Sequence, residues 1–193
     1  MRGSRYGLLA LTGALLLQIA PAAAAQTVLY DKSRISCVSR QENVPVEAQF
    51  RKFTAQIAFD PARPEAGKAQ IEIDLDSFDI GFAEYNSDAK GKNWFDVRSF
   101  PRATFVSTSM RALGGGRFEV RGPLTIKGKT NDVVAPFTYK DDAGTGVFEG
   151  VFTIKRLQYN IGDGVWRDTR TVADDVQIKF RFAVAAGKPP AKK

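Results

Sequence analysis

Side chains that could perform acid–base, nucleophilic or metal chemistry are scarce in this sequence. The 193 residues include no His and a single Cys, Cys37. Without His the chain lacks the commonest general base and the commonest metal ligand. The acidic pairs that could serve an enzyme are Asp74 with Asp76 and Asp174 with Asp175, and the first pair lies on the polar face of a predicted strand. We expect no catalytic residue and no metal site. An enzyme acting on a lipid stays an alternative, which an inward carboxylate of raised pKa would support.

Cys37 lies in a stretch where apolar and polar residues alternate. We interpret it as a small, buried apolar residue. A lone Cys cannot form an intramolecular disulfide, so pairing between two chains is the remaining alternative.

Phenylalanine, with 14 residues, is the most informative residue type for binding. Most of these rings fall on the apolar faces of predicted strands. A small barrel can be filled by such side chains or can hold one small ligand, and the sequence leaves both open. Trp94 and Phe95 are expected at the mouth of a pocket, where aromatic side chains often close an apolar cavity. The candidate ligand-binding residues are Phe50, Phe53, Ile57, Phe59, Ile71, Ile73, Trp94, Phe95, Phe105, Phe118, Leu124, Ile126, Phe137, Tyr139, Phe148, Phe152, Ile178, Phe180 and Phe182.

Strands must position these side chains, because alternation of apolar and polar residues dominates the sequence. Turn signals at 60–64, 114–116 and 141–144 separate the alternating runs. A shift of phase around Arg51 and Lys52 predicts a β-bulge. The pattern predicts one helix over 82–91, after the third strand, and eight strands over 33–41, 45–59, 68–77, 103–112, 116–127, 131–140, 145–156 and 172–184.

Eight antiparallel strands with short loops define an all-β fold. Such strands must hide their edges, and closure into a barrel does so. A two-sheet sandwich would carry the same alternation, so the pattern alone leaves both architectures open.

Residues 1–25 predict a secretory signal peptide. Arg2 and Arg5 precede an apolar run over 8–20 and a small-residue stretch over 22–25. The run is shorter than the roughly 20 apolar residues of a membrane span. An uncleaved N-terminal anchor is the alternative. We expect an exported protein that begins near Gln26.

The expected mature chain is mildly basic. Removing Arg2 and Arg5 leaves 26 basic against 21 acidic side chains, a net charge of +5. No basic stripe with interleaved aromatic residues is present, so we expect no nucleic-acid partner. Weak attraction to an anionic membrane surface is a minor alternative. Residues 26–184 are expected to form one domain, and the basic, Pro-containing tail over 185–193 is expected to be disordered.

Three segments carry a family resemblance. Residues 57–61 read IAFDP and are followed by AQIEID at 69–74; residues 94–108 read WFDVRSFPRATFVST; residues 120–130 read VRGPLTIKGKT. In this order and spacing they resemble the YceI-like family of polyisoprenoid-binding, lipocalin-like proteins of bacterial periplasms. The resemblance covers about residues 29–184.

The resemblance implies an eight-stranded antiparallel lipocalin-like β-barrel in the periplasm, with no cofactor. It implies binding, transport or storage of a long isoprenoid, such as a quinone or a polyprenyl lipid, held lengthwise in the barrel. This chain departs from the family in lacking a His near residues 33–35, in its brief helix region, and in the segment 160–168, where Trp166 is expected to be exposed. These departures are expected to alter the entrance of the predicted barrel rather than its strands.

A different class of function stays open from sequence. A barrel filled by its own side chains could regulate a membrane redox partner such as a cytochrome, and an exposed apolar patch would mark it. The sequence does not determine the head group, the chain length or the oligomeric state.

Overall fold

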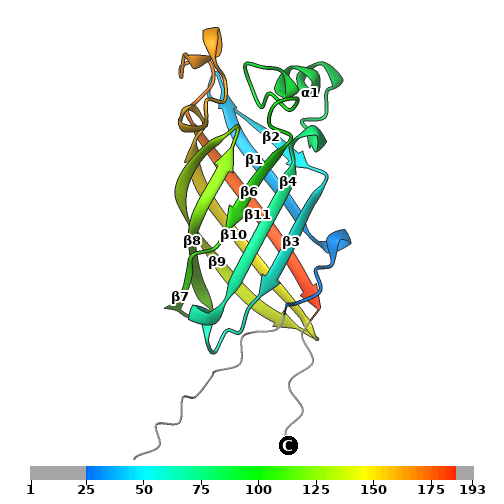
Figure 1. Ribbon diagram of the computed structural model, residues 1–193, viewed down its shortest axis with the longest axis vertical. Coiled ribbons are helices and arrows are strands. Elements are labelled where there is room, and N and C mark those ends of the chain that lie inside the picture. The colour runs from blue at the N-terminus through cyan, green and yellow to red at the C-terminus, as the bar shows by residue number, and fades with distance from the viewer. Residues whose placement is uncertain (1–24, 186–193) are drawn as a thin grey trace, which may run out of the picture.

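The fold is an antiparallel β-sheet that curls into a barrel (Figure 1). The computed structural model describes residues 25–185. Residues 1–24 of the predicted signal peptide and residues 186–193 of the predicted tail lie outside the described residues. The predicted all-β, lipocalin-like architecture with one short helix is confirmed. Its elements are β1 (Arg34–Gln41), β2 (Val44–Phe50), β3 (Phe53–Ala58), β4 (Lys68–Asp74), β5 (Phe78–Asp79), α1 (Ala83–Lys90), β6 (Arg102–Val106), β7 (Ser109–Gly114), β8 (Arg117–Ile126), β9 (Lys129–Asp142), β10 (Thr145–Lys155) and β11 (Asp175–Ala185).

Neighbouring strands follow the order β3-β4-β6-β8-β9-β10-β11-β1-β2-β5, with β7 paired to β8. Their register places apolar residues opposite one another on the inner face. Phe148 lies opposite Phe182, and Phe152 lies opposite Ile178. Because side chains alternate along a strand, the next residues on either side point outward. The alternation read from the sequence therefore becomes an apolar interior and a polar exterior.

The strand predicted over 45–59 breaks into β2 and β3 at Arg51 and Lys52, so the predicted bulge is wrong. Arg51 N–H donates to the Ser77 carbonyl, and the Lys52 carbonyl accepts from Asp74 N–H. Before this bend β2 pairs with β5, and after it β3 pairs with β4. The two halves of one bent strand thus belong to opposite edges of the ladder, and the bend helps to close the barrel.

The strand predicted over 103–112 also breaks, giving β6 and β7. Ser107 N–H donates to the Ala69 carbonyl of β4, whereas Thr108 N–H donates to the Arg121 carbonyl of β8. Consecutive residues therefore bond to different neighbours, and the strand cannot continue straight. With the added two-residue strand β5, the eight predicted strands become eleven among residues 25–185.

Residues 26–29 fill the seam between β3 and β11. Gln26 N–H donates to the Ile57 carbonyl at 2.7 Å, and Leu29 N–H donates to the Ala183 carbonyl at 2.8 Å. In return Thr27 accepts from Ala185 N–H at 2.8 Å. This short segment satisfies backbone groups on two strands that do not pair with each other.

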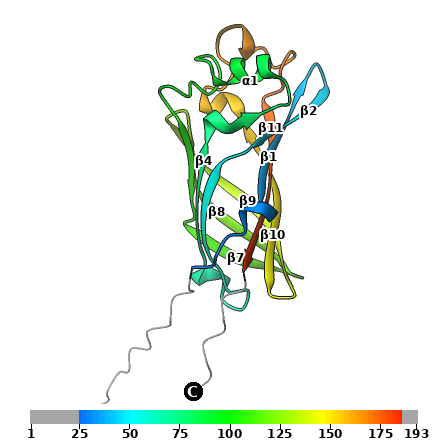
Figure 2. The same ribbon diagram turned by 90° about the vertical axis from the view of Figure 1, so that its right-hand side faces the viewer.

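The two ends of the barrel differ. Figure 2 shows α1, the turn between β1 and β2, and the segment between β10 and β11 gathered at one end. The opposite end carries the turn between β7 and β8. The loops at the first end, which we call the mouth, are the ones that can admit a ligand.

Candidate apolar binding cavity

The barrel encloses a cavity of about 460 Å³. Typical ligand pockets occupy roughly 300–1,000 Å³. The lining is almost wholly aliphatic and aromatic, and it runs from Met110 and Phe137 deep in the barrel to Phe82, Tyr85 and Trp166 at the mouth. Such a cavity removes an elongated apolar guest from water along its length.

Most of the residues predicted from sequence surround this cavity. They are Phe50, Ile57, Ile71, Ile73, Trp94, Phe95, Phe105, Leu124, Ile126, Phe137, Phe148, Phe152, Ile178, Phe180 and Phe182. Binding by any one of them stays a prediction. Phe53, Phe59, Phe118 and Tyr139 belong to the predicted set but do not line the cavity.

Three of these four form the floor of the cavity. The Phe59 ring centroid lies 5.1 Å from Phe118, 5.2 Å from Tyr139 and 5.3 Å from Phe148. Rings at these separations attract one another beyond their area of burial. Phe59 and Phe118 are buried by this cluster. The cavity therefore ends on a packed aromatic layer.

Phe53 instead packs at the seam. Its ring lies 5.6 Å from Tyr30 and 5.8 Å from Phe182, measured between centroids. It supports the ring of Phe182 from the side, while Phe182 itself faces the cavity.

The cavity wall depends on a glycine in β10. A Cβ at Gly150 would lie 2.4 Å from Cζ of Phe180, which is too close for any side chain. Gly150 pairs directly with Phe180 across the strands. Because Gly150 has no side chain, the Phe180 ring can pack directly against the backbone of β10.

Two tryptophans meet at the mouth. The rings of Trp94 and Trp166 lie 5.6 Å apart and inclined by 48°. Both line the cavity, and both are half-buried. The expectation that Trp166 is exposed is wrong, because the 3₁₀ turn Gly164–Arg167 folds its ring back onto Trp94.

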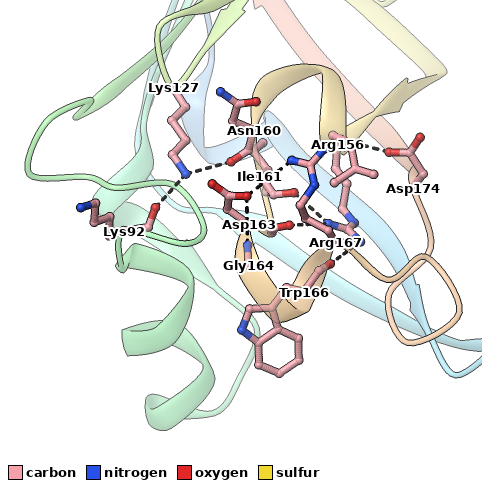
Figure 3. A network of polar contacts seen from close by, with 12 residues as sticks. Lys92, Lys127, Arg156, Asn160, Ile161, Asp163, Gly164, Trp166, Arg167 and Asp174 are labelled. Atoms are coloured by element: carbon pink, nitrogen blue, oxygen red, sulfur yellow. Dashed lines mark hydrogen bonds and ion pairs between the residues drawn. The ribbon is translucent and has the colours of Figure 1, made fainter.

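A buried arginine holds the mouth together (Figure 3). Arg156 is only 1% exposed. Its guanidinium donates to five backbone carbonyls, those of Ile161, Gly162, Trp166, Val172 and Ala173, at 2.7–3.2 Å. Arginine has five N–H donors, so its donor capacity is filled.

The charge of Arg156 is balanced by dipoles rather than by a direct partner. None of the ion pairs among residues 25–185 includes it. Burial lowers its pKa and nearby Asp174 opposes this, but a guanidinium stays protonated in proteins. The Trp94 ring adds a cation–π contact, with the guanidinium carbon 6.0 Å from the ring centroid.

The chain around Arg156 is adapted to it. Gly162 has a φ of +80°, and a Cβ there would lie 2.1 Å from Nη1 of Arg156. Glycine is the residue that accepts both constraints.

Further bonds tie the segment 156–174 to the loop after α1. Lys127 Nζ donates to the carbonyls of Lys92 and Asn160, each at 2.8 Å (Figure 3). Asn93 accepts from the N–H groups of Gly162 and Asp163. Partial burial lowers the pKa of Lys127. The mouth is therefore one hydrogen-bonded unit.

Cys37 faces the cavity from β1. Burial, together with the charge of Glu47, raises the pKa of its thiol to about 12. The thiol stays protonated at neutral pH and acts as a small apolar wall residue.

Sequence reasoning missed several lining residues. Ile35, Leu75, Met110 and Val120 lie on inner faces whose alternation is visible in the sequence, so that signal could have found them. Arg156 has no such signal, because a single Arg after a strand is ordinarily a surface residue.

Acidic groups are peripheral to the cavity. Asp74, Asp76, Asp174 and Asp175 do not line it, and Asp88, which does, is exposed at the mouth. Within residues 25–185 no group of three or more His, Cys, Asp or Glu side chains could hold a metal ion. No helix in this part of the chain is long and apolar enough to cross a membrane.

Comparison with known proteins assigns the chain to a family. The model of the YceI-like domain matches residues 27–184. A UPF0312 protein of Ectopseudomonas mendocina is 31% identical over 129 residues, covering 64% of this chain and 68% of that protein. A UPF0312 protein of Pseudomonas savastanoi is 30% identical over 142 residues, covering 70% of this chain and 72% of that protein.

Two solved structures show the same architecture. BcnA of Burkholderia cenocepacia is 49% identical, with a TM-score of 0.79 over 81% of this chain and 98% of that chain. A polyisoprenoid-binding domain from Saccharophagus degradans, implicated in plant cell wall breakdown, is 17% identical, with a TM-score of 0.68 over 86% of this chain and 99% of that chain.

Fold and cavity define the class: a lipocalin-like barrel built around an apolar pocket. Within that class the chain belongs to the YceI-like family, as the sequence resemblance predicted.

Proposed function

We propose that this protein binds a long isoprenoid lipid in its barrel and transports or stores it in the periplasm. The observation that carries the proposal is the apolar cavity of about 460 Å³, closed by an aromatic floor and open toward the mouth. The family match and the description of the Saccharophagus degradans domain as polyisoprenoid-binding support it. The predicted signal peptide supports the location.

Hydrophobic burial supplies enough free energy for such binding. Each buried CH₂ contributes about 0.8 kcal/mol, so one five-carbon isoprene unit contributes about 3–4 kcal/mol before costs. Ordering of the lipid and loss of its translational freedom reduce the net value. Several units in the cavity still favour the bound state over water.

The cavity also favours binding over the alternative of a filled regulatory barrel, since its lining surrounds open space. Catalysis has less support, because the predicted acidic pairs lie away from the lumen. A prenyl quinone and a polyprenyl phosphate are the two cargo candidates. A membrane cytochrome is a candidate partner, but no feature of the described residues supports it.

The direct test identifies the cargo. The full chain is produced with its own N-terminus in a Gram-negative host, purified from the periplasmic fraction and measured by native mass spectrometry, followed by solvent extraction of lipids. We expect a bound prenyl species. A protein that is empty and also fails to take up a prenyl quinone added in detergent would contradict the proposal.

Neighbouring residues on β10 give a matched test of where the cargo lies. Phe152 lines the cavity, whereas Val151 is 47% exposed on the outer face. We expect Phe152→Asp to abolish uptake of a prenyl quinone, because its carboxylate would be desolvated by an apolar guest. Val151→Asp should retain wild-type uptake. Quenching of Trp94 and Trp166 by the quinone provides the readout, and circular dichroism shows that each variant is folded. Equal uptake by both variants would place the cargo outside the barrel.

A further inference from the structure

The most exposed large apolar side chains of the described residues gather at the mouth. Val165 is 83% exposed, Phe82 66%, Val44 61% and Tyr85 57%. The other exposed large apolar residues, on the walls and lower parts of the barrel, range from 39% to 49%. The four come from three separate segments of the chain, namely the start of β2 beside the β1–β2 turn, α1 with its N-cap, and the 3₁₀ turn Gly164–Arg167. We call these four residues the mouth tips.

The mouth tips project from a connected scaffold. Glu42 N–H donates to the Thr171 carbonyl, and Ala173 N–H donates to the Arg40 carbonyl, which joins the β1–β2 turn to the segment between β10 and β11. That segment is joined in turn to the loop after α1 through Asn93 and Lys127. The segments that carry the tips are therefore hydrogen-bonded to one another.

The mouth carries little net charge. Segments 40–44, 81–101 and 156–174 contain equal numbers of basic and acidic side chains, and Lys127, which bonds to two of these segments, adds one positive charge. Several of these charges pair locally, as in Arg170 with Asp168 at 2.7 Å and Arg167 with Asp163 at 3.4 Å. A partner that meets this end need not carry charge.

The tips are continuous with the cavity. Phe82 and Tyr85 are both exposed and both line the cavity, and their rings contact each other at 5.9 Å. Apolar side chains thus extend from the lumen to the exposed surface of the mouth. Aromatic side chains with a polar tip, such as Tyr85, suit the boundary between water and lipid.

We propose that the mouth docks on the surface of a phospholipid bilayer, with Val44, Phe82, Tyr85 and Val165 entering the interfacial region. Separate protruding tips fit a soft lipid surface better than the flat, shape-complementary core of a protein interface. Because the mouth carries little net charge, the attraction is mainly hydrophobic rather than electrostatic. Docking goes beyond cargo binding, and an empty barrel docks equally well.

The test uses the two valine tips, because neither lines the cavity. Purified full-length protein is mixed with phosphatidylcholine vesicles and separated by flotation at low and high salt. We expect wild type to float at both salt concentrations. Val44→Ser with Val165→Ser should weaken vesicle binding by about tenfold or more, since two exposed apolar side chains no longer enter the lipid. Uptake of prenyl quinone from detergent should stay at the wild-type level, which separates docking from cargo binding.

A matched control changes two valines on the barrel wall. Val106 and Val151 are each 47% exposed. Val106→Ser with Val151→Ser should bind vesicles as wild type does. Equal weakening in both double variants would overturn the proposal in favour of unspecific adsorption. Flotation only with phosphatidylglycerol vesicles, abolished by salt, would overturn it in favour of basic patches elsewhere. Failure of wild type to float would also overturn it, and a tip-dependent dimer in sedimentation would assign the tips to a second copy.

Discussion

At the scale of single residues, Arg156 is the group on which the mouth depends. Its five donors replace the regular hydrogen bonds that the irregular segment 156–174 cannot make for itself. A buried carbonyl without a donor costs about 1–3 kcal/mol. One side chain thus stabilises the long loop over residues 156–174.

We expect Arg156→Lys to lower the free energy of unfolding by about 2–4 kcal/mol, because an ammonium has three donors and leaves at least two buried carbonyls without one. Urea denaturation measures the loss. Faster amide exchange over 157–174 would locate it. Arg167→Lys is the control, since Arg167 is exposed and makes one ion pair at 3.4 Å. Unchanged stability of the Arg156 variant would contradict the assigned role.

The aromatic lining could be predicted from sequence, whereas the role of Arg156 could not. Phe152 and Phe180 reveal their orientation through alternation, a local property of a strand. The contacts of Arg156 depend on where residues 161–173 fold in space, and no local pattern encodes that. The sequence also predicts Phe59 as a lining residue, although it lies in the floor. Alternation shows which side of the sheet a side chain faces but not how deep in the barrel it lies.

At the scale of elements, the barrel closes through pieces that are not full strands. The bend at Arg51 and Lys52 and the segment 26–29 connect edges that make no ladder with each other. Sequence predicted both halves of the bent strand but not the change of partner, because pairing across the barrel is non-local. The two-residue strand β5 was missed because it is too short to show alternation.

Removal of residues 26–32 should destabilise the barrel. The deletion breaks the three backbone hydrogen bonds of 26–29 and the contact of Tyr30 with Phe53. At about 0.5–1.5 kcal/mol for each hydrogen bond, we expect a loss of about 2–4 kcal/mol. Thermal and urea denaturation of the protein lacking 1–32, compared with one lacking 1–25, measure it. Asp31→Ala serves as a control within the same segment, because Asp31 is exposed. Equal midpoints for the two deletions would show that the seam does not need this segment.

At the scale of the whole molecule, the absence of His shapes the response to pH. No side chain of ordinary pKa titrates between about pH 5 and 7 in this chain. The groups that respond are carboxylates that titrate at lower pH, among them the half-buried Asp79 and Asp168. Bonds from Gly81 N–H, then from Arg51 and Asn86, hold the pKa of Asp79 at about 2, and Arg170 does the same for Asp168.

The unfolding temperature should be flat between about pH 5 and 7 and should fall in acid. Asp79 and Asp168 have folded-state pKa values of about 2, below the ordinary 3.8. Their contribution is complete above pH 3.8 and disappears as pH falls through about 2. Calorimetry from pH 2 to 7 tests this. Asp79→Asn should flatten part of the acid limb, and a marked slope near pH 6 would contradict the prediction.

The aromatic floor closes one end of the barrel. A tube sealed at one end allows no passage through it. Under the proposed function, a bound lipid would leave by the same opening that admitted it, and its tail would enter first and leave last. The barrel could then not act as a ratchet. Net movement of cargo between two membranes would follow the concentration gradient, and any directionality would come from whatever consumes the lipid at its destination.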